Sequence, residues 1–210
     1  MTSGLASIDT PKRRPLTDAL GLQPGMLPGG GNFYPEEDVL MLLAEKAAAS
    51  SEIVLCGGGT AAAVAAKATS GRVTILETCA RMIQVSERWL DIVGAEACII
   101  ETDLEEYDKH NMWYPRHVLN RVPNHVDLLF IDGPGHFAGR MPRWPAGPEL
   151  FPRLAPSGIV LLDDGRRVKE KKALKRWAED FPSLRQVKTK TSGGAVLLIP
   201  EERRGQKCTY

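Results

Sequence analysis

Short apolar runs alternate with helical segments along most of this chain, and that alternation constrains its fold more than any other feature. The runs are nearly uninterrupted by polar residues, as buried parallel strands are. Strands that alternate with helices predict a Rossmann-like, doubly wound α/β sheet, because parallel neighbours require crossover connections. Five such strands are expected at 52–56, 72–77, 96–103, 126–132 and 157–164, and helices at 35–49, 60–68, 80–94, 145–155 and 167–181.

The last part of the chain breaks this alternation. The runs LRQVKTK and AVLLIPE follow one another with only residues 191–194 between them. So short a connection can join only antiparallel neighbours. We therefore expect a seven-stranded sheet that is mostly parallel and ends in a C-terminal antiparallel hairpin.

Length and composition indicate one globular domain. The 210 residues suffice for a single core, with 43% hydrophobic and 25% charged residues and a net charge of +1. This charge gives no general reason to expect nucleic acid as a partner. No apolar run is long enough for a membrane span or a signal peptide, so a cytoplasmic protein is expected. The four cysteines lack CxxC spacing and are expected to be free, buried thiols. We expect a flexible arm at 1–33, the domain at 34–200 and a polar tail at 201–210.

A glycine-rich loop follows the first expected strand. Read as Gly57-x-Gly59-x-x-Ala62, it fits the dinucleotide fingerprint, in which backbone N–H groups and a helix N-terminus approach a nucleotide cofactor. The pattern does not distinguish NAD, a flavin or another nucleoside cofactor. The candidate cofactor-binding residues of this loop are Cys56, Gly57, Gly58, Gly59 and Thr60.

Acidic residues follow four of the five expected parallel strands, at the edge where such sheets bind ligands. Glu77, followed by Thr78, is placed to accept the ribose hydroxyls of an adenosine, and Asp103 to meet an adenine amino group. The other reading of each is a solvated strand-end acid. So many carboxylates disfavour a pyrophosphate and suit a cation or a sugar diol.

Three of these acids suggest a metal site. Asp132 ends one strand, and Asp163 and Asp164 end the next, so their mutual repulsion is relieved by a cation such as Mg²⁺. The alternative is one functional aspartate plus an N-cap at Asp164. His136, just after Asp132, is a candidate general base, or a loop histidine that only forms hydrogen bonds.

The helix expected at 167–181 is rich in lysine and arginine, which raises the alternative of an RNA-binding surface. Its charges fall all round the helix, as on a solvated outer helix. Val168, Ala173, Leu174 and Trp177 are expected to face the core.

Residues 34–199 resemble class I S-adenosylmethionine (SAM)-dependent O-methyltransferases in the motifs CGGGT, VTILE, VDLLFIDGPGH and LAPSGIVLLDDGRR. The segment is similar to small bacterial methyltransferases associated with glycans or natural products, and more distantly to metal-dependent catechol and macrocin O-methyltransferases. The resemblance implies SAM as cofactor and O-methylation of a hydroxyl on a small molecule or glycan. By position it implies Mg²⁺ on Asp132, Asp163 and Asp164, and a catalytic pair of His136 and Asp132.

The sequence departs from this family at the end of the first strand. An acid that holds the SAM amino group is usual there, and Leu55 and Cys56 stand in its place. Either Asp132 or the region of Tyr34 takes that role, or SAM binding is weak.

Several functions therefore stay open beside O-methylation: a non-catalytic SAM-fold binding module, an FAD- or NAD-dependent oxidoreductase, and an RNA methyltransferase. The sequence also leaves a homodimer open. The loops at 104–125 and 134–148 are expected to contact the methyl acceptor, with candidates Trp113, Tyr114, Arg143 and Trp144.

Overall fold

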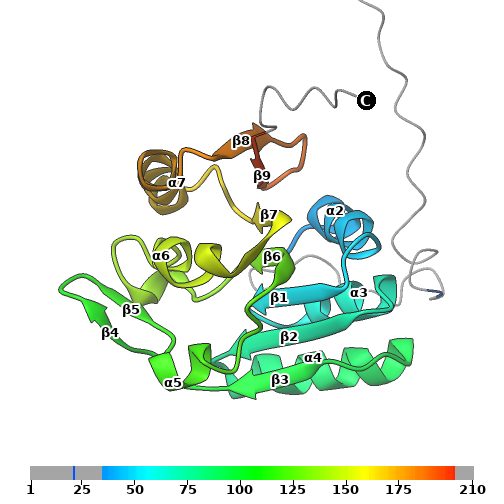
Figure 1. Cartoon of the computed structure of the whole chain (residues 1–210). Coiled ribbons are helices and arrows are strands. Elements are labelled where there is room, and N and C mark those ends of the chain that lie inside the picture. The colour runs from blue at the N-terminus through cyan, green and yellow to red at the C-terminus, as the bar shows by residue number, and fades with distance from the viewer. Residues whose placement is uncertain (1–20, 22–34, 202–210) are drawn as a thin grey trace, which may run out of the picture.

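The computed structural model describes Gly21 and residues 35–201, which form a seven-stranded sheet and a separate two-stranded sheet (Figure 1). The expected arm, apart from Gly21, and nearly all of the expected tail lie outside the described residues. The helices are α2 (Glu37–Ala47), α3 (Thr60–Ala68), α4 (Ala80–Val93), α5 (Arg116–Leu119), α6 (Ala146–Leu150) and α7 (Val168–Asp180), with short 3₁₀ turns η1 (His136–Ala138) and η2 (Phe151–Arg153). The strands are β1 (Glu52–Cys56), β2 (Arg72–Glu77), β3 (Cys98–Glu101), β4 (Glu105–Asp108), β5 (Asn111–Trp113), β6 (Val126–Ile131), β7 (Leu154–Leu162), β8 (Leu184–Lys188) and β9 (Val196–Pro200).

The large sheet has the strand order β3-β2-β1-β6-β7-β9-β8. β1 pairs in parallel with both β2 and β6, while β9 runs antiparallel to β7 and β8. This arrangement confirms the doubly wound, mostly parallel sheet and its antiparallel C-terminal hairpin. The chain leaves β1 toward β2 and later returns to its other side as β6, so the strand order reverses between β1 and β6. Ligands of open α/β sheets bind at such a reversal.

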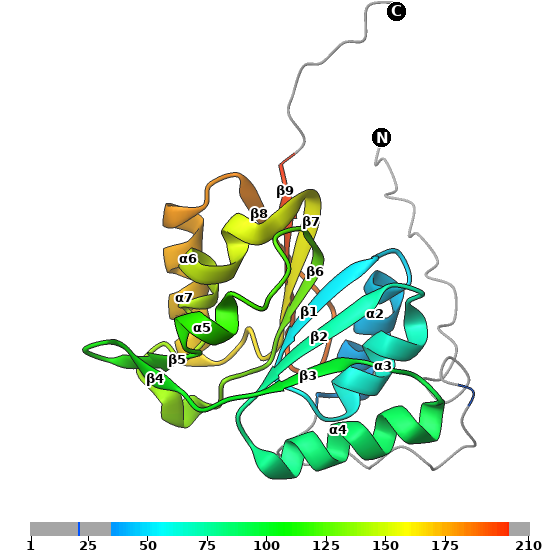
Figure 2. The same cartoon turned by 60° about the horizontal axis from the view of Figure 1, so that its bottom comes forward.

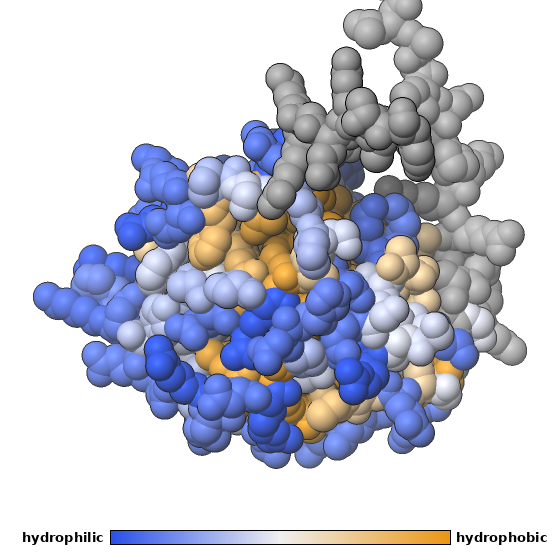
Figure 3. Space-filling view, viewed as in Figure 1, coloured by the Kyte–Doolittle hydropathy of each residue, from blue (hydrophilic) through white to orange (hydrophobic). Residues whose placement is uncertain are grey.

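Helices cover both faces of the sheet (Figure 2). α2, α3 and α4 pack on one face, and α5, α6 and α7 pack on the other. All the alanines of α3 up to Ala66 are buried, because the small side chains let this helix lie closely between α2 and α4. In Figure 3, hydrophilic residues predominate around the outline of the visible face, and hydrophobic residues show near its middle. Among the described residues, no helix has both the length and the apolar character that a membrane span requires.

The segment between β3 and β6, which was expected to be a loop at 104–125, contains a small hairpin. β4 and β5 pair antiparallel in a sheet of their own. The Asp108 carboxylate caps their turn by accepting hydrogen bonds from the backbone N–H groups of His110 (2.7 Å) and Asn111 (2.9 Å). This turn chemistry is local, yet the polar strands carry too little apolar alternation for the sequence to predict them.

Some expected element bounds were wrong. The helix expected at 145–155 is α6 followed by η2, and Leu154 begins a strand because it pairs with Val126 in register. The third strand is shorter than 96–103. Of the cysteines expected to be buried, Cys79 and Cys98 are free but exposed, because Cys79 precedes α4 and Cys98 lies in the edge strand β3. Cys56 is free and buried as expected. Cys208 lies outside the described residues.

Helix α7 confirms three of its four expected core residues. Ala173, Leu174 and Trp177 are buried, whereas Val168 at the first position of the helix is 69% exposed. A charged residue, Glu170, is buried in its place and faces Arg143.

Truncation of Trp177 should destabilise the fold strongly. Its indole is buried against Phe151, and its Nε1 donates to the Trp144 carbonyl at 2.9 Å. We expect Trp177→Ala to lower the free energy of unfolding in urea by about 3–5 kcal/mol. The exposed neighbour Lys175→Ala should change it by less than about 0.5 kcal/mol. Equal stability of the two variants would contradict this packing.

Candidate active site

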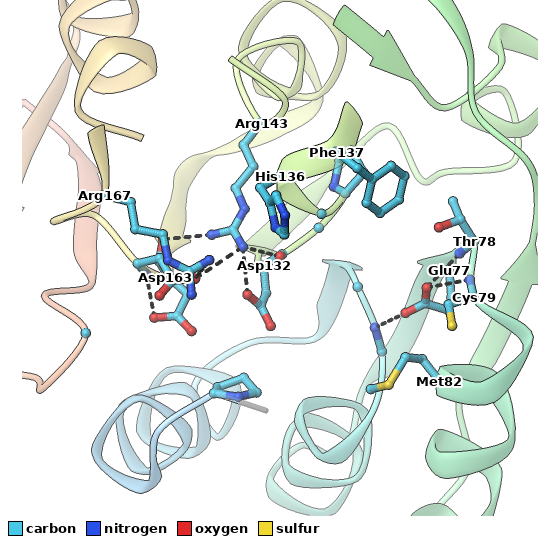
Figure 4. A pocket seen from close by; sticks show the side chains of 18 of the residues that line it. Glu77, Thr78, Cys79, Met82, Asp132, His136, Phe137, Arg143, Asp163 and Arg167 are labelled. Carbon is cyan, nitrogen blue, oxygen red and sulfur yellow. Dashed lines mark hydrogen bonds and ion pairs between the residues drawn. The ribbon is translucent and has the colours of Figure 1, made fainter. Parts of the chain in front are cut away.

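A cavity of about 480 Å³ lies at the carboxyl ends of β1, β2, β6 and β7 (Figure 4). It spans the point where the strand order reverses, as expected for this sheet type. Its lining comes from the glycine loop, the two residues after β2, the loop after β6 and the turn after β7. These residues include Gly57, Gly58, Glu77, Thr78, Cys79, Met82, Tyr114, Asp132, Gly133, His136, Phe137, Arg143, Asp163, Asp164 and Arg167.

The glycine loop is held by three different partners, one for each of its backbone N–H groups. Gly57 donates to the Leu76 carbonyl at 2.9 Å, Gly58 to Glu77 Oε2 at 2.8 Å, and Gly59 to Ser86 Oγ at 2.7 Å. The N–H groups of all three glycines are thereby satisfied inside the protein. The loop is fixed against β2 and α4 before any ligand arrives.

Two glycines allow the loops after β1 and β6 to touch. The Cys56 carbonyl accepts hydrogen bonds from the N–H groups of Asp132 (2.9 Å) and Gly133 (2.7 Å). A Cβ at Gly57 would lie 3.2 Å from the Gly133 nitrogen, and a Cβ at Gly133 would lie 3.2 Å from Gly57. Gly57 also has φ of 99°, which other residues rarely adopt. Both the space and the backbone conformation therefore favour glycine at Gly57, and a side chain at Gly133 would have to push the facing backbone away by a few tenths of an ångström.

Glu77 is a buried acid that organises the backbone around it. Its Oε1 accepts from the N–H groups of Thr78 (2.7 Å) and Cys79 (2.9 Å), and its Oε2 accepts from Gly58. The side chain lines the cavity, although the residue is only 7% exposed. One lone pair of Oε2 is left for a ligand hydroxyl.

The three predicted aspartates do come together. Each of Asp132, Asp163 and Asp164 offers a carboxylate oxygen within 4.8 Å of the others. Two arginines already face them. Arg143 Nη2 lies 2.9 Å from Asp132 Oδ1 and 3.4 Å from Asp164 Oδ2, and Arg167 Nη1 lies 2.8 Å from Asp164 Oδ2. Figure 4 shows both arginine side chains reaching toward these acids.

Burial and crowding change how these carboxyls titrate. Burial, followed by the charges of Asp132 and Asp164, raises the pKa of Asp163 to about 7. Burial also raises the pKa of Asp132, although the adjacent Arg143 guanidinium acts in the opposite direction. The surrounding carboxylates outweigh desolvation at Arg143 and raise its pKa. The cluster is thus an electrostatically strained group of acids around one buried cation.

The loop after β6 brings His136 and Phe137 to the cavity on the turn η1. Both side chains are accessible, and Phe137 is 75% exposed, which is unusual for a phenylalanine. Lys169 Nζ fixes this turn by donating to the carbonyls of His136 (2.7 Å) and Gly139 (2.6 Å). The turn therefore presents an imidazole and an aromatic ring on a fixed backbone.

Not every predicted site residue reaches the cavity. Cys56 is fully buried in the core, where burial raises the pKa of its thiol, and Asp103 is exposed outside the cavity. Gly59 and Thr60 lie behind the lining, and Thr60 Oγ1 is buried without a partner among the described residues. Tyr34 lies outside the described residues.

The candidate acceptor residues divide in the same way. Tyr114 and Arg143 line the cavity, whereas Trp113 and Trp144 pack elsewhere. Leu55 stands where the resembling family usually has an acid. Its side chain is fully buried in the core, so this position offers no place for an acid.

Sequence reasoning missed two residues that shape the site, Ser86 and Arg167. Ser86 is a buried polar residue in the middle of α4, and its hydroxyl bonds both the Gly59 N–H and the Met82 carbonyl. A serine on the inner side of an amphipathic helix was the available signal. Arg167 belonged to the basic helix, whose charges were interpreted as a solvated surface or, alternatively, as an RNA-binding one.

Solved structures of methyltransferases share this fold. A methyltransferase from Geobacter sulfurreducens is 14% identical, with 84% of this chain and 91% of that chain covered and a TM-score of 0.60. Precorrin-6y C5,15-methyltransferase from Geobacter metallireducens GS-15 is 17% identical (86% and 96% covered, TM-score 0.61). The O-methyltransferase TomG from Streptomyces achromogenes, solved in complex with SAM, is 14% identical (88% and 86% covered, TM-score 0.55).

No protein-family model matches the sequence, and no curated protein matches it significantly. The likeness to the solved structures therefore establishes the fold.

Removal of the Ser86 hydroxyl should loosen the glycine loop. The Gly59 N–H is buried and would lose its acceptor, which costs about 1–3 kcal/mol. We expect Ser86→Ala to lower the free energy of unfolding by that amount in urea denaturation. Glu87→Ala, an exposed change one residue away in α4, is the control and should have little effect. A Ser86→Ala protein as stable as this control would show that the bond contributes nothing.

Proposed function

We propose that the chain is a SAM-dependent methyltransferase that methylates a hydroxyl group on a small molecule or glycan. The observation that carries the proposal is the continuous cavity that joins the glycine loop, Glu77 and the acids after β6 and β7. A nucleoside fits the part of the cavity that is lined by the glycine loop and Glu77. The acids beyond them suit the positively charged methionine part of SAM better than a pyrophosphate. SAM in the TomG structure, which has the same fold, supports this reading.

Methyl transfer requires little covalent chemistry from the protein. The acceptor oxygen attacks the methyl carbon in line with the carbon–sulfur bond, which breaks and leaves S-adenosylhomocysteine. The protein must position both substrates and take up the hydroxyl proton. In our proposal His136 accepts that proton, because it is the accessible imidazole of the cavity lining, while Asp132 orients the SAM amino group or the acceptor.

The methyl acceptor is proposed only as a class. Phe137 offers an exposed aromatic surface beside His136, and Tyr114 and Arg143 also line the cavity. A flat or ring-shaped alcohol, such as a phenol or a sugar, fits such a lining. Three expectations from the sequence belong to this proposal: a cytoplasmic protein, no nucleic acid partner, and a chain that works alone or as a homodimer.

The alternative functions make different predictions. An NAD or flavin enzyme would bind those cofactors, and a non-catalytic module would bind SAM without transferring its methyl group. An RNA methyltransferase would bind RNA with steep salt dependence.

Calorimetric titration with SAM, S-adenosylhomocysteine, NAD and FAD distinguishes the proposed methyltransferase from an NAD or flavin enzyme. We expect the two sulfur compounds alone to bind. Failure of S-adenosylhomocysteine to bind at millimolar concentration would overturn the proposal. Mass spectrometry of a panel of phenols, catechols and sugars incubated with SAM then separates the enzyme from the inactive module.

Glu77→Gln should weaken cofactor binding selectively. The amide keeps the size of the side chain but places an NH₂ group against N–H donors of Gly58 or Thr78, and it weakens hydrogen bonds to the ribose. We expect the Kd of S-adenosylhomocysteine to rise about tenfold or more, which corresponds to about 1.4 kcal/mol. Glu101→Gln is the matched control, because Glu101 is the exposed residue beside Glu77 on β3. Equal affinity in both variants would remove Glu77 from the cofactor site.

His136→Ala should slow the chemical step and leave cofactor binding intact. Loss of a general base typically costs about 10²–10⁴-fold in rate. Single-turnover methyl transfer to an acceptor from the panel measures this rate, and calorimetry measures SAM affinity. His117→Ala, an exposed histidine on α5, is the control. A rate equal to that of the control would exclude His136 as the base.

A further inference from the structure

Arg143 lies where the carboxylate cluster would hold a cation. Its Nη1 donates to the Asp163 carbonyl at 2.9 Å, and its Nη2 donates to the Asp132 carbonyl. The same Nη2 also faces the Asp132 and Asp164 carboxylates at 2.9 and 3.4 Å. The guanidinium thus joins the ends of β6 and β7 through both backbone and side chain.

The Arg143 side chain is built into this position. It is 5% exposed, and the buried Glu170 carboxylate of α7 lies 3.8 Å from its Nε. Arg167 adds a second positive charge on the solvent side of Asp164. Two guanidinium groups therefore face the three aspartates, and a fourth carboxylate holds Arg143 from behind.

This arrangement does not fit Mg²⁺ in the same cluster. Mg²⁺ binds oxygen at about 2.1 Å, so an ion on Asp132 Oδ1 would lie within about 5 Å of the Arg143 Nη2. The two cations would repel each other at that distance, and the guanidinium groups already face one carboxylate oxygen of Asp132 and one of Asp164. The sequence predicted a magnesium ion on these three aspartates. The structure brings the three acids together, and the binding of the ion stays a prediction.

We propose that Arg143 is the resident counter-cation of the Asp132, Asp163 and Asp164 cluster, and that the cluster binds no divalent cation while Arg143 is in place. Arg143 is then a positioning residue, which fixes the ends of β6 and β7 where a metal ion would otherwise do so. Methyl transfer by this site would need no metal. The proposal concerns the cluster itself and holds or fails independently of the bound cofactor.

Titration of the full chain with Mn²⁺, followed by electron paramagnetic resonance of the free ion, tests this directly. We expect the wild-type protein to bind no Mn²⁺ at the cluster at millimolar concentration. Arg143→Met removes the charge and keeps most of the side-chain volume, so it should create a site for one ion per chain. Asp164→Asn added to Arg143→Met should abolish that site. Arg140→Met, an exposed change in the same loop, is the control and should bind none.

The wild-type result decides the matter even if Arg143→Met does not fold. If the wild-type chain binds one Mn²⁺ and Asp164→Asn abolishes that binding, the proposal is overturned. Wild-type binding that persists in both Asp163→Asn and Asp164→Asn lies outside the cluster and supports it. If Arg143→Met folds, as shown by circular dichroism, and binds no ion, the claim that Arg143 keeps metal out of the cluster is wrong.

Discussion

The site depends on the contact between the loops that follow β1 and β6. The Cys56 carbonyl accepts hydrogen bonds from two N–H groups of the β6 loop, and Gly57 and Gly133 approach so closely that a Cβ at either position would crowd the facing backbone. This contact joins the two loops at the point where the strand order of the sheet reverses. The glycine loop on one side and the acids on the other thereby become two walls of one cavity.

Electrostatics organises the second wall. Acids gather there because parallel strands place their carboxyl ends at one edge, and burial makes their mutual repulsion costly. Arg143 relieves part of that cost from within the cluster and also binds the backbone carbonyls of Asp132 and Asp163, the residues that directly follow β6 and β7. Burial, followed by the charges of Asp132 and Asp164, nevertheless raises the pKa of Asp163. A cationic ligand such as the sulfonium and amino groups of SAM would find a favourable environment here.

The sequence predicted those parts of the fold that depend on local pattern. The buried strands appear as apolar runs, the short link before β9 dictates the antiparallel hairpin, and Glu77 follows from its distance to the glycine loop. It did not predict contacts that tertiary packing creates. Arg143 reaches acids 11 and 21 residues away, and Ser86 reaches the loop from α4. On α7, Glu170 is buried opposite Arg143 while Val168 is exposed.

The central claim is that one preformed cavity, between the glycine loop and the β6 loop, binds a SAM-type nucleoside. Amide ¹H–¹⁵N spectra of the 23.0 kDa chain, recorded during addition of S-adenosylhomocysteine, test it directly. We predict the largest shifts at Gly57, Gly58, Thr78 and Gly133, with little change at the distant β8 strand. Shifts confined to other parts of the chain, or none at saturating ligand, would contradict it.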